Sequence, residues 1–301
     1  MVLLQFVTLK KRGQNIRCAV VTDTNSGFTR EDAKGYGIEL IPMPVIIDDQ
    51  THYEGVDIDE TQFYEWQKEG RRITTSQPAP GNVMKMWDDL LAQGYEAIIH
   101  IPMTSGLSNS CQTAMMLAED YDGKVIVIDD HRISIPLQES VLKARKLADE
   151  GIDPETIKKT LEEDGLRSSI YISVNTLKYL KRGGRITPAV ALIGSVLGIK
   201  PILTIQGEKL DTFSKARSMK KCRTIMIDAL KKDYKERFSN YEWNDLCVGA
   251  AGTGLSQEEI EAWINMLQKE FPETTVRYSP LSLSIGTHTG PGAIGCAICV
   301  K

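Results

Sequence analysis

The first half of the chain alternates short apolar, β-branched runs with segments in which apolar residues recur every three or four positions. The runs are typical of buried strands and the periodic segments of amphipathic helices. The predicted strands are 16–22, 38–47, 97–101 and 125–128, and the predicted helices are 30–34, 59–69, 82–93, 112–120, 133–149 and 154–163. Alternation at this spacing predicts a mostly parallel, Rossmann-like sheet with helices on its faces. We assign it to an N-terminal α/β domain over residues 16–167, and we expect residues 1–15 to be an extension.

After Gly165 the pattern changes, because strand-like runs follow one another without helical crossovers. The predicted strands are 169–174, 199–205, 209–213, 246–250, 274–278 and 293–300, and the predicted helices are 217–230 and 257–270. The residues 206–208 form a hairpin signal between two of these strands, which should therefore be antiparallel. The second half of the chain predicts a C-terminal mixed α/β domain over residues 168–301.

Composition narrows the possible functions. The chain has 301 residues, a formal net charge of −4 and a sequence pI of about 5.7, whereas a nucleic-acid binder normally carries a basic excess. Six scattered cysteines do not suggest a disulfide framework. No apolar run approaches the roughly 18–20 residues of a membrane-spanning helix. The first 14 residues place an apolar stretch before the basic residues, which is the reverse of a signal peptide. We therefore expect a cytoplasmic protein with neither a nucleic-acid partner nor integral membrane association.

Two short motifs near the C-terminus resemble functional motifs, but the residues around them argue against a functional role. The residues 290–295 match G-x-G-x-x-G, but only six residues follow, so there is no room for the helix that binds phosphate. Cys296 and Cys299 form a C-x-x-C, yet residues three apart on a strand point to opposite faces. The four histidines are isolated, so no metal site is expected. No P-loop, G-x-S-x-G or H-E-x-x-H motif supports an enzyme.

Three segments are rich in small hydroxyl side chains and glycine, namely 74–78, 104–110 and 286–292. The second follows a predicted strand and precedes a predicted helix, at the sheet edge where open α/β folds bind ligands. Backbone N–H groups at a helix start, and Ser, Thr and His side chains, donate hydrogen bonds to a carboxylate. Any one of these segments could instead only cap a helix. Together they favour an anion site.

At these segments the sequence resembles the DegV family of fatty-acid-binding proteins. The resemblance extends from about Ile16 to the C-terminus and rests on several motifs in one order. They are Thr22-Asp23-Thr24, Thr75-Ser76-Gln77-Pro78, Ser105-Gly106-Leu107-Ser108, the run 177–186, Ile199-Lys200-Pro201-Ile202-Leu203 and His288-Thr289-Gly290-Pro291-Gly292-Ala293. Several motifs in a fixed order are more specific than any one of them alone.

The resemblance implies a two-domain α/β fold that encloses a long-chain fatty acid in a tunnel between the domains. It implies a non-catalytic protein without a cofactor, which presents the bound acid to a separate ATP-dependent kinase for acyl-phosphate formation. The implied contacts of the carboxylate are Thr75, Ser76, Ser105 and His288, and the implied cleft or partner contacts are Arg182, Arg185, Gly106 and Thr287. We expect a carboxylate beside His288 to favour the protonated imidazole.

The sequence departs from the family pattern in three places. The segment 23–28 replaces the usual D-S-T motif and the residues after it, and Asn109 stands where the family has glycine. The residues 133–137 replace a glycine-containing stretch and could line the acyl tunnel, which leaves the preferred chain length and unsaturation open. Four methionines could also line the tunnel or simply fill the core. They are Met43, Met103, Met115 and Met116.

Other interpretations remain at this point. A lipid hydrolase or acyl transferase could use Ser105 or Ser76 as nucleophile with His288 as base, although no nucleophile-elbow sequence surrounds either serine. A regulatory protein with a purely structural lipid is a second alternative, and a nucleotide enzyme is a weak third. The basic segment 178–185 is either a solvated helix end or a patch that docks a partner or steers phosphate.

Overall fold

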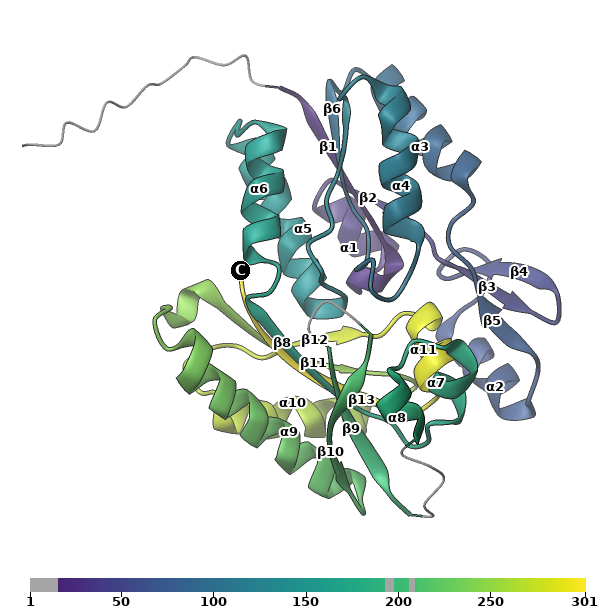
Figure 1. Cartoon of the computed structure of the whole chain (residues 1–301), viewed down its shortest axis with the longest axis vertical. Coiled ribbons are helices and arrows are strands. Elements are labelled where there is room, and N and C mark those ends of the chain that lie inside the picture. The colour runs from purple at the N-terminus through teal and green to yellow at the C-terminus, as the bar shows by residue number, and fades with distance from the viewer. Residues whose placement is uncertain (1–15, 193–197, 206–208) are drawn as a thin grey trace, which may run out of the picture.

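The structure is a computed structural model that describes residues 16–192, 198–205 and 209–301. The extension expected at 1–15 and the turn expected at 206–208 lie outside the described residues. Figure 1 shows a parallel sheet with its helices in the upper part of the view and a second sheet with two long helices below it. The mixed α/β architecture predicted from the pattern is confirmed.

The upper sheet has four parallel strands in the order β2-β1-β6-β7. Its strands are β1 (Cys18–Asp23), β2 (Ile38–Ile41), β6 (Ala97–Ile101) and β7 (Val125–Val127), and its helices are α1 (Arg30–Gly35), α3 (Pro80–Ala92), α4 (Ser110–Ala118), α5 (Ser134–Asp149) and α6 (Pro154–Asp164). Val21 packs with Trp87 of α3 on one face, whereas Val20 packs with Val141 of α5 on the other. Burial on both faces explains why these strands are continuous apolar runs.

A second, three-stranded sheet corrects two predictions. The run 38–47 was predicted as one extended segment, but its two halves belong to two different sheets. The segment 74–78 was predicted as a loop, but its first two residues are the end of a strand. The sheet has the antiparallel order β4-β3-β5, with β3 (Pro44–Ile47), β4 (Gln50–Tyr53) and β5 (Ile73–Thr75), and α2 (Glu60–Glu69) lies beside it. Asp48 and Asp49 have φ of 46° and 68°, the conformation of a two-residue hairpin turn that Asp favours.

The lower sheet is mixed, with six strands in the order β10-β9-β8-β13-β11-β12, and only β11 and β12 are parallel neighbours. The strands are β8 (Ser168–Ser173), β9 (Lys200–Ile205), β10 (Asp211–Ala216), β11 (Leu246–Gly252), β12 (Arg277–Pro280) and β13 (Ile294–Val300), and the helices α9 (Met219–Asp233) and α10 (Gln257–Glu270) cover one face. A strand follows the glycine motif, as expected. Cys296 packs beneath α9 and α10, whereas Cys299 packs on the face turned to α5, so the C-x-x-C cysteines lie on opposite faces.

Three short helices lie between the lower sheet and the three-stranded sheet (Figure 1). They are α7 (Lys178–Gly183), α8 (Pro188–Leu192) and α11 (Leu283–Thr289). The segment 286–292 is therefore helical in its first half, which corrects the prediction of a loop. Ser282 caps the helix by accepting a hydrogen bond from the N–H of Ile285, and Gly290 ends it with a φ of 75°. The Thr287 and Thr289 hydroxyls donate to carbonyls one turn earlier, so they stabilise the helix locally.

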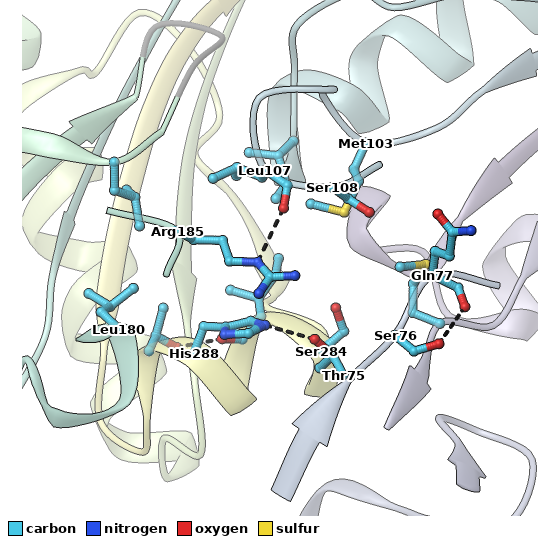
Figure 2. Close-up of a pocket in the computed structure, with 15 residues that line it drawn as sticks. Thr75, Ser76, Gln77, Met103, Leu107, Ser108, Leu180, Arg185, Ser284 and His288 are labelled. Atoms are coloured by element: carbon cyan, nitrogen blue, oxygen red, sulfur yellow. Dashed lines mark hydrogen bonds between the residues drawn. The ribbon is translucent and has the colours of Figure 1, made fainter. Parts of the chain in front are cut away.

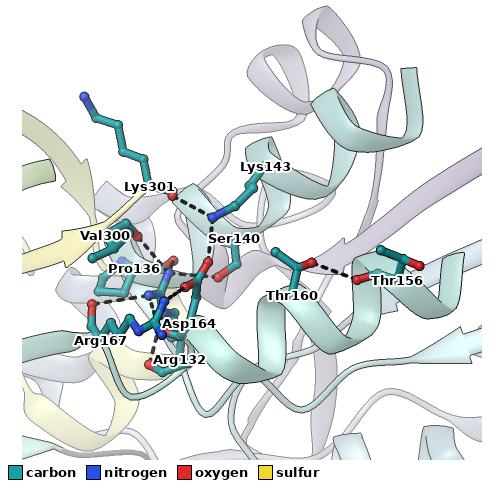
Figure 3. A network of polar contacts seen from close by, with 11 residues as sticks. Arg132, Pro136, Ser140, Lys143, Thr156, Thr160, Asp164, Arg167, Val300 and Lys301 are labelled. Atoms are coloured by element: carbon teal, nitrogen blue, oxygen red, sulfur yellow. Dashed lines mark hydrogen bonds and ion pairs between the residues drawn. The ribbon is translucent and has the colours of Figure 1, made fainter. Parts of the chain in front are cut away.

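Arg132 joins the two halves at a buried junction (Figure 3). Its side chain is 1% exposed. The guanidinium donates to the carbonyls of Asp164 and Gly165 before β8, to the carbonyl of Val300 at the end of β13, and to the Ser140 hydroxyl on α5. All three guanidinium nitrogens have acceptors, which a buried charge requires.

Candidate functional site

The site is built around an outer cavity of about 70 Å³ (Figure 2). Its walls come from the end of β5, from the loops after β6 and β7, from the segment 180–185 with Leu210, and from α11. Its polar lining groups are Thr75, Ser76, Gln77, Ser108, Arg185, Ser284, His288 and Thr289. The structure thus brings together four residues singled out from the sequence, namely Thr75, Ser76, Arg185 and His288.

Thr75 and His288 meet although they are far apart in the sequence. Thr75 ends β5, where it pairs with Val45 of β3, and the distance from its Oγ1 to His288 Nε2 is 2.8 Å. Helix α11 is held against this sheet because the Gln67 side chain of α2 donates to the carbonyl of Gly286. In the tautomer with its proton on Nε2, the imidazole donates to Thr75, and the threonine hydroxyl can donate into the cavity.

The protein's own groups determine the protonation of His288 without a ligand, and its protonation beside a bound carboxylate stays a prediction. Burial, and second the positive charge of Arg185, lower the pKa of His288 to about 4. We expected a protonated imidazole beside a carboxylate, but the protein's own groups favour the neutral ring at pH 7. The ring also packs closely on Gly183, where an added Cβ would lie 2.0 Å from Nδ1. A side chain at this position would displace the histidine.

Arg185 supplies the positive charge of the outer cavity. Its Nε donates to the carbonyl of Leu107 over 3.3 Å, so the side chain connects the two halves of the chain across the cavity. Its Nη1 donates to the carbonyl of Gly183 over 2.5 Å. Its Nη2 has no acceptor among the described residues. This nitrogen is therefore available to an anion.

The structure places the predicted serine and glycine contacts differently from one another. Ser76 lines it but is exposed and donates to the carbonyl of Gln77 over 2.7 Å. Ser105 and Gly106 do not line it, whereas Leu107 and Ser108 of the same loop do. The role given to Ser105 remains a prediction.

An inner, apolar cavity of about 70 Å³ adjoins the outer one. Five residues line both cavities and form the ring between them, namely Leu107, Ile133, Leu210, Ile285 and Thr289. The inner cavity continues over β8, β9, β11 and β13 beneath the start of α5, with Ile172, Ala251 and Ala297 in its lining. The segment 133–137 thus contributes Ile133, Ser134, Ile135 and Pro136 to the walls. Met43 and Met103 line the outer cavity, whereas Met115 and Met116 line neither.

A third, wider cavity of about 380 Å³ shares Thr75, Arg185 and His288 with the outer cavity. Thr287 also lines this cavity. Four basic side chains besides Arg185 and His288 line it as well, and we call them the basic rim: Arg71, Arg72, Lys178 and Arg182. Two of these are paired, Arg71 with Asp48 and Arg72 with Asp49. Lys178 and Arg182 have no acidic partner in the part of the chain that the structure describes.

Sequence reasoning did not single out Ser284 and Ile285, and it included Ser108 and Thr289 only as members of the hydroxyl-rich segments 104–110 and 286–292. Three of them lie on α11, together with His288, at the spacing of one helical face. The signal was present, since Ser282 and Gly290 are typical helix-capping residues at the two ends of this segment.

A family model described as "Uncharacterised protein, DegV family" matches residues 17–301. The chain belongs to the DegV family. A DegV domain-containing protein of Listeria monocytogenes is 33% identical over 293 residues, which cover 95% of this chain and 100% of the relative. Protein DegV of Bacillus subtilis is 33% identical over 287 residues, which cover 94% of this chain and 99% of the relative. The family resemblance stated from the motifs is confirmed.

Solved DegV structures have the same fold. DegV from Bacillus subtilis, described as a fatty acid binding protein, has a TM-score of 0.84 at 30% identity over 95% of this chain and 100% of that chain. A DegV family protein from Thermus thermophilus, described for its fatty acid binding, has a TM-score of 0.83 at 26% identity over the same shares. The DegV-like fold that the resemblance implied is therefore confirmed.

Neither a metal centre nor a membrane-spanning helix is found among the described residues. Within residues 16–192, 198–205 and 209–301, no group of three or more His, Cys, Asp or Glu side chains is placed to hold a metal ion. Of the described helices, none is both long and apolar enough to cross a membrane.

Proposed function

We propose that this DegV family member binds a long-chain fatty acid, with the carboxylate in the outer cavity and the acyl chain in the inner one. The observation that carries this proposal is the junction of the two cavities. Polar donors and Arg185 line the outer cavity beside apolar side chains, whereas the adjoining inner cavity is lined almost entirely by apolar groups. A ligand with one charged end and a long apolar chain matches this division.

The acyl chain and the carboxylate of the ligand contribute differently to binding. Burying a methylene is worth about 0.8 kcal/mol, so a chain of roughly 16–18 carbons gains about 10 kcal/mol before ordering costs. The two cavities are small, and the acyl chain enters only if the side chains of the shared ring move apart. Leu107 and Ile285 are only partly buried, which favours such movement. Affinity then comes chiefly from the acyl chain.

The polar end fixes the orientation of the ligand. A buried carboxylate without partners is strongly disfavoured. The hydroxyls of Thr75 and Ser108 and the free nitrogen of Arg185 offer hydrogen bonds and a positive charge at the outer cavity. His288 acts on the carboxylate through Thr75. Ser76 and Ser105 are secondary contacts in this proposal.

We further propose that the bound acid is presented to a separate ATP-dependent kinase. The carboxylate would attack the γ-phosphorus of ATP on the kinase, which yields an acyl phosphate and ADP. The basic rim supports this proposal, because it lines a cavity that shares Thr75, Arg185 and His288 with the outer cavity, and because it includes the exposed Arg182. Six free, buried cysteines fit a reducing compartment, so we place the protein in the cytoplasm.

A serine hydrolase is the less favoured alternative. A serine nucleophile needs a base within hydrogen-bond reach and a group that orients the base. Here the partner of His288 is Thr75, and Ser76 donates to a backbone carbonyl. Burial also lowers the pKa of His288 to about 4, which makes it a weak base.

The test begins with freshly purified, full-length protein, from which lipid is extracted with organic solvent and identified by mass spectrometry. The protein is then stripped of lipid and titrated with octadecanoic acid, with heptadecane as the matched ligand that lacks a carboxylate. We expect about one equivalent of fatty acid in the extract and saturable binding of octadecanoic acid. An empty extract together with no saturable binding would contradict the proposal, and turnover of a chromogenic ester would favour the hydrolase.

A further inference from the structure

The inner cavity contains a buried hydroxyl group that the protein does not use. Ser134 lines this cavity and is 7% exposed. Its Oγ has no hydrogen-bond partner among the described residues. A buried hydroxyl without a partner is costly, and native structures contain few of them. Among the buried polar atoms without a partner, this hydroxyl also lines an apolar cavity, where it can donate a hydrogen bond to a ligand.

The neighbouring hydroxyl of the same cavity is different. Thr289 Oγ1 donates to the carbonyl of Ile285 over 3.0 Å, so its hydrogen is already engaged within α11. The nearby Arg132 does not compensate Ser134, because its guanidinium donates to Ser140 and to carbonyls at the junction. Ser134 is thus a distinct donor on the wall of the inner cavity.

The start of α5 adds further donors at the same place. This helix of 16 residues begins at Ser134, and no side chain caps its first turn. The N–H groups of Ser134 and Ile135 have no acceptor among the described residues, and Pro136 has no N–H. The first turn of a helix carries a partial positive charge from such groups. The Ser134 backbone has a φ of 56°, a region that residues other than glycine seldom adopt.

We propose that the inner cavity recognises an oxygen atom carried by the acyl chain, with a hydroxy fatty acid as the ligand class. This inference rests on the proposed fatty-acid function and deepens it. The ligand hydroxyl would accept a hydrogen bond from Ser134 Oγ, and the partial charge of α5 would reinforce that bond. A carboxylate is the poorer match for this position, because the full positive charge lies at Arg185 in the outer cavity.

The experiment compares octadecanoic acid with a series of hydroxyoctadecanoic acids whose hydroxyl occupies different carbons. Each acid is titrated into delipidated full-length protein and into the variant Ser134→Gly. Glycine removes the hydroxyl and tolerates the positive φ, so this variant should fold at least as well as the parent. Ser134→Ala, checked by thermal unfolding, is a second variant without the hydroxyl. Ser110→Ala is the matched control, since Ser110 is likewise a buried hydroxyl without a partner among the described residues at the start of a helix, but lines none of the three cavities.

The measured quantity is the affinity for a hydroxy acid divided by the affinity for octadecanoic acid. We expect this ratio to be highest for isomers with the hydroxyl far from the carboxylate, and to fall about tenfold in both Ser134 variants. The ratio should stay the same in Ser110→Ala. An unchanged ratio in the Ser134 variants, or the same ratio for every isomer, would overturn the inference while leaving fatty-acid binding intact. Failure of the parent protein to bind any of the acids would overturn the proposed function itself.

Discussion

Two clusters of hydrogen-bonding groups lie between the halves of this molecule, and they differ in how far the protein satisfies them. At the Arg132 junction every nitrogen of a buried guanidinium has an acceptor in the protein. At the outer cavity, Arg185 keeps one nitrogen without an acceptor in the described part of the chain, and the Thr75 hydroxyl faces the same space. In each cluster an arginine guanidinium connects residues that are distant in sequence.

The difference separates a structural role from a binding role. In a saturated cluster no donor or acceptor remains free to bind a ligand. Its arginine therefore contributes to the relative placement of the two halves. An unsaturated cluster at a cavity remains incomplete until a ligand arrives. Spare hydrogen-bonding capacity, rather than the presence of charge, is therefore the feature that distinguishes the proposed binding site. The same criterion identifies Ser134 in the inner cavity.

The largest effect is expected for the variant Arg132→Leu, which tests the structural role of the junction. Removing the guanidinium leaves several buried carbonyls without donors, so we expect the free energy of unfolding to fall by about 3–5 kcal/mol. Urea unfolding measures this change. Lys143→Met is the control at the edge of the same network. It removes a partly exposed ion pair with Asp164, so the free energy of unfolding should fall by less than about 1 kcal/mol. Fatty-acid affinity of the folded Arg132 variant should stay near the parental value, and selective loss of binding at normal stability would reverse the assigned roles.

A smaller effect should appear in the pH dependence of stability at His288. Its folded pKa of about 4 lies below the ordinary value of 6.5, so the unfolded chain binds a proton that the folded protein excludes. The stabilising contribution is present above about pH 6.5 and is lost as the pH falls toward 4. Relative to His288→Gln, the parent should lose roughly 2 kcal/mol between pH 7.5 and pH 5. Urea unfolding of delipidated proteins at both pH values gives the difference, and a pH-independent difference would contradict a buried neutral imidazole.

The variant Thr75→Val tests the binding role proposed for the outer cavity. The substitution keeps the shape of the side chain but removes the hydroxyl that lies between His288 and the cavity. We expect about a tenfold loss of octadecanoate affinity, typical of one hydrogen bond to a charged group. Ser76→Ala is the matched control and should change affinity less, because Ser76 is exposed and bonded to a carbonyl. Equal losses in the two variants would mean that the carboxylate lies elsewhere.

The smallest expected effect concerns the basic rim. Arg182 is exposed and lines the wide cavity, so Arg182→Glu should leave octadecanoate affinity unchanged within about twofold. Transfer from ATP by a bacterial fatty acid kinase subunit should slow about threefold to tenfold, with weaker dependence on salt. Trapping the acyl phosphate with hydroxylamine measures the rate. Lys181→Glu, on the same helix but outside the three cavities described, is the control, and equal slowing in both variants would indicate a general effect of charge.

The two large sheets could be predicted from the sequence because buried strands and amphipathic helices carry strong local periodicity. The three-stranded sheet was missed, since its strands are only three or four residues long and one of them is Gln50–Tyr53, which is polar. Helix α11 was missed because Gly, Thr and His are weak helix formers, and its capping residue Ser282 was overlooked.

The site was predictable only in part. Thr75, Ser76, Arg185 and His288 stood in recognisable motifs, and the structure places all four at one cavity. The ring between the cavities could not be deduced, because Leu107 and Leu210 come together only when the two halves pack. The free hydroxyl of Ser134 was equally inaccessible, since a missing partner is visible only once all neighbours are placed.

The most direct test is a crystal structure of the delipidated protein after reloading with octadecanoic acid. The account predicts a carboxylate oxygen within about 3 Å of Thr75 Oγ1 and close to Arg185, with the acyl chain passing between Leu107 and Ile285 into the inner cavity. A carboxylate bound at the start of α5, or an acyl chain lying along the basic rim, would contradict it.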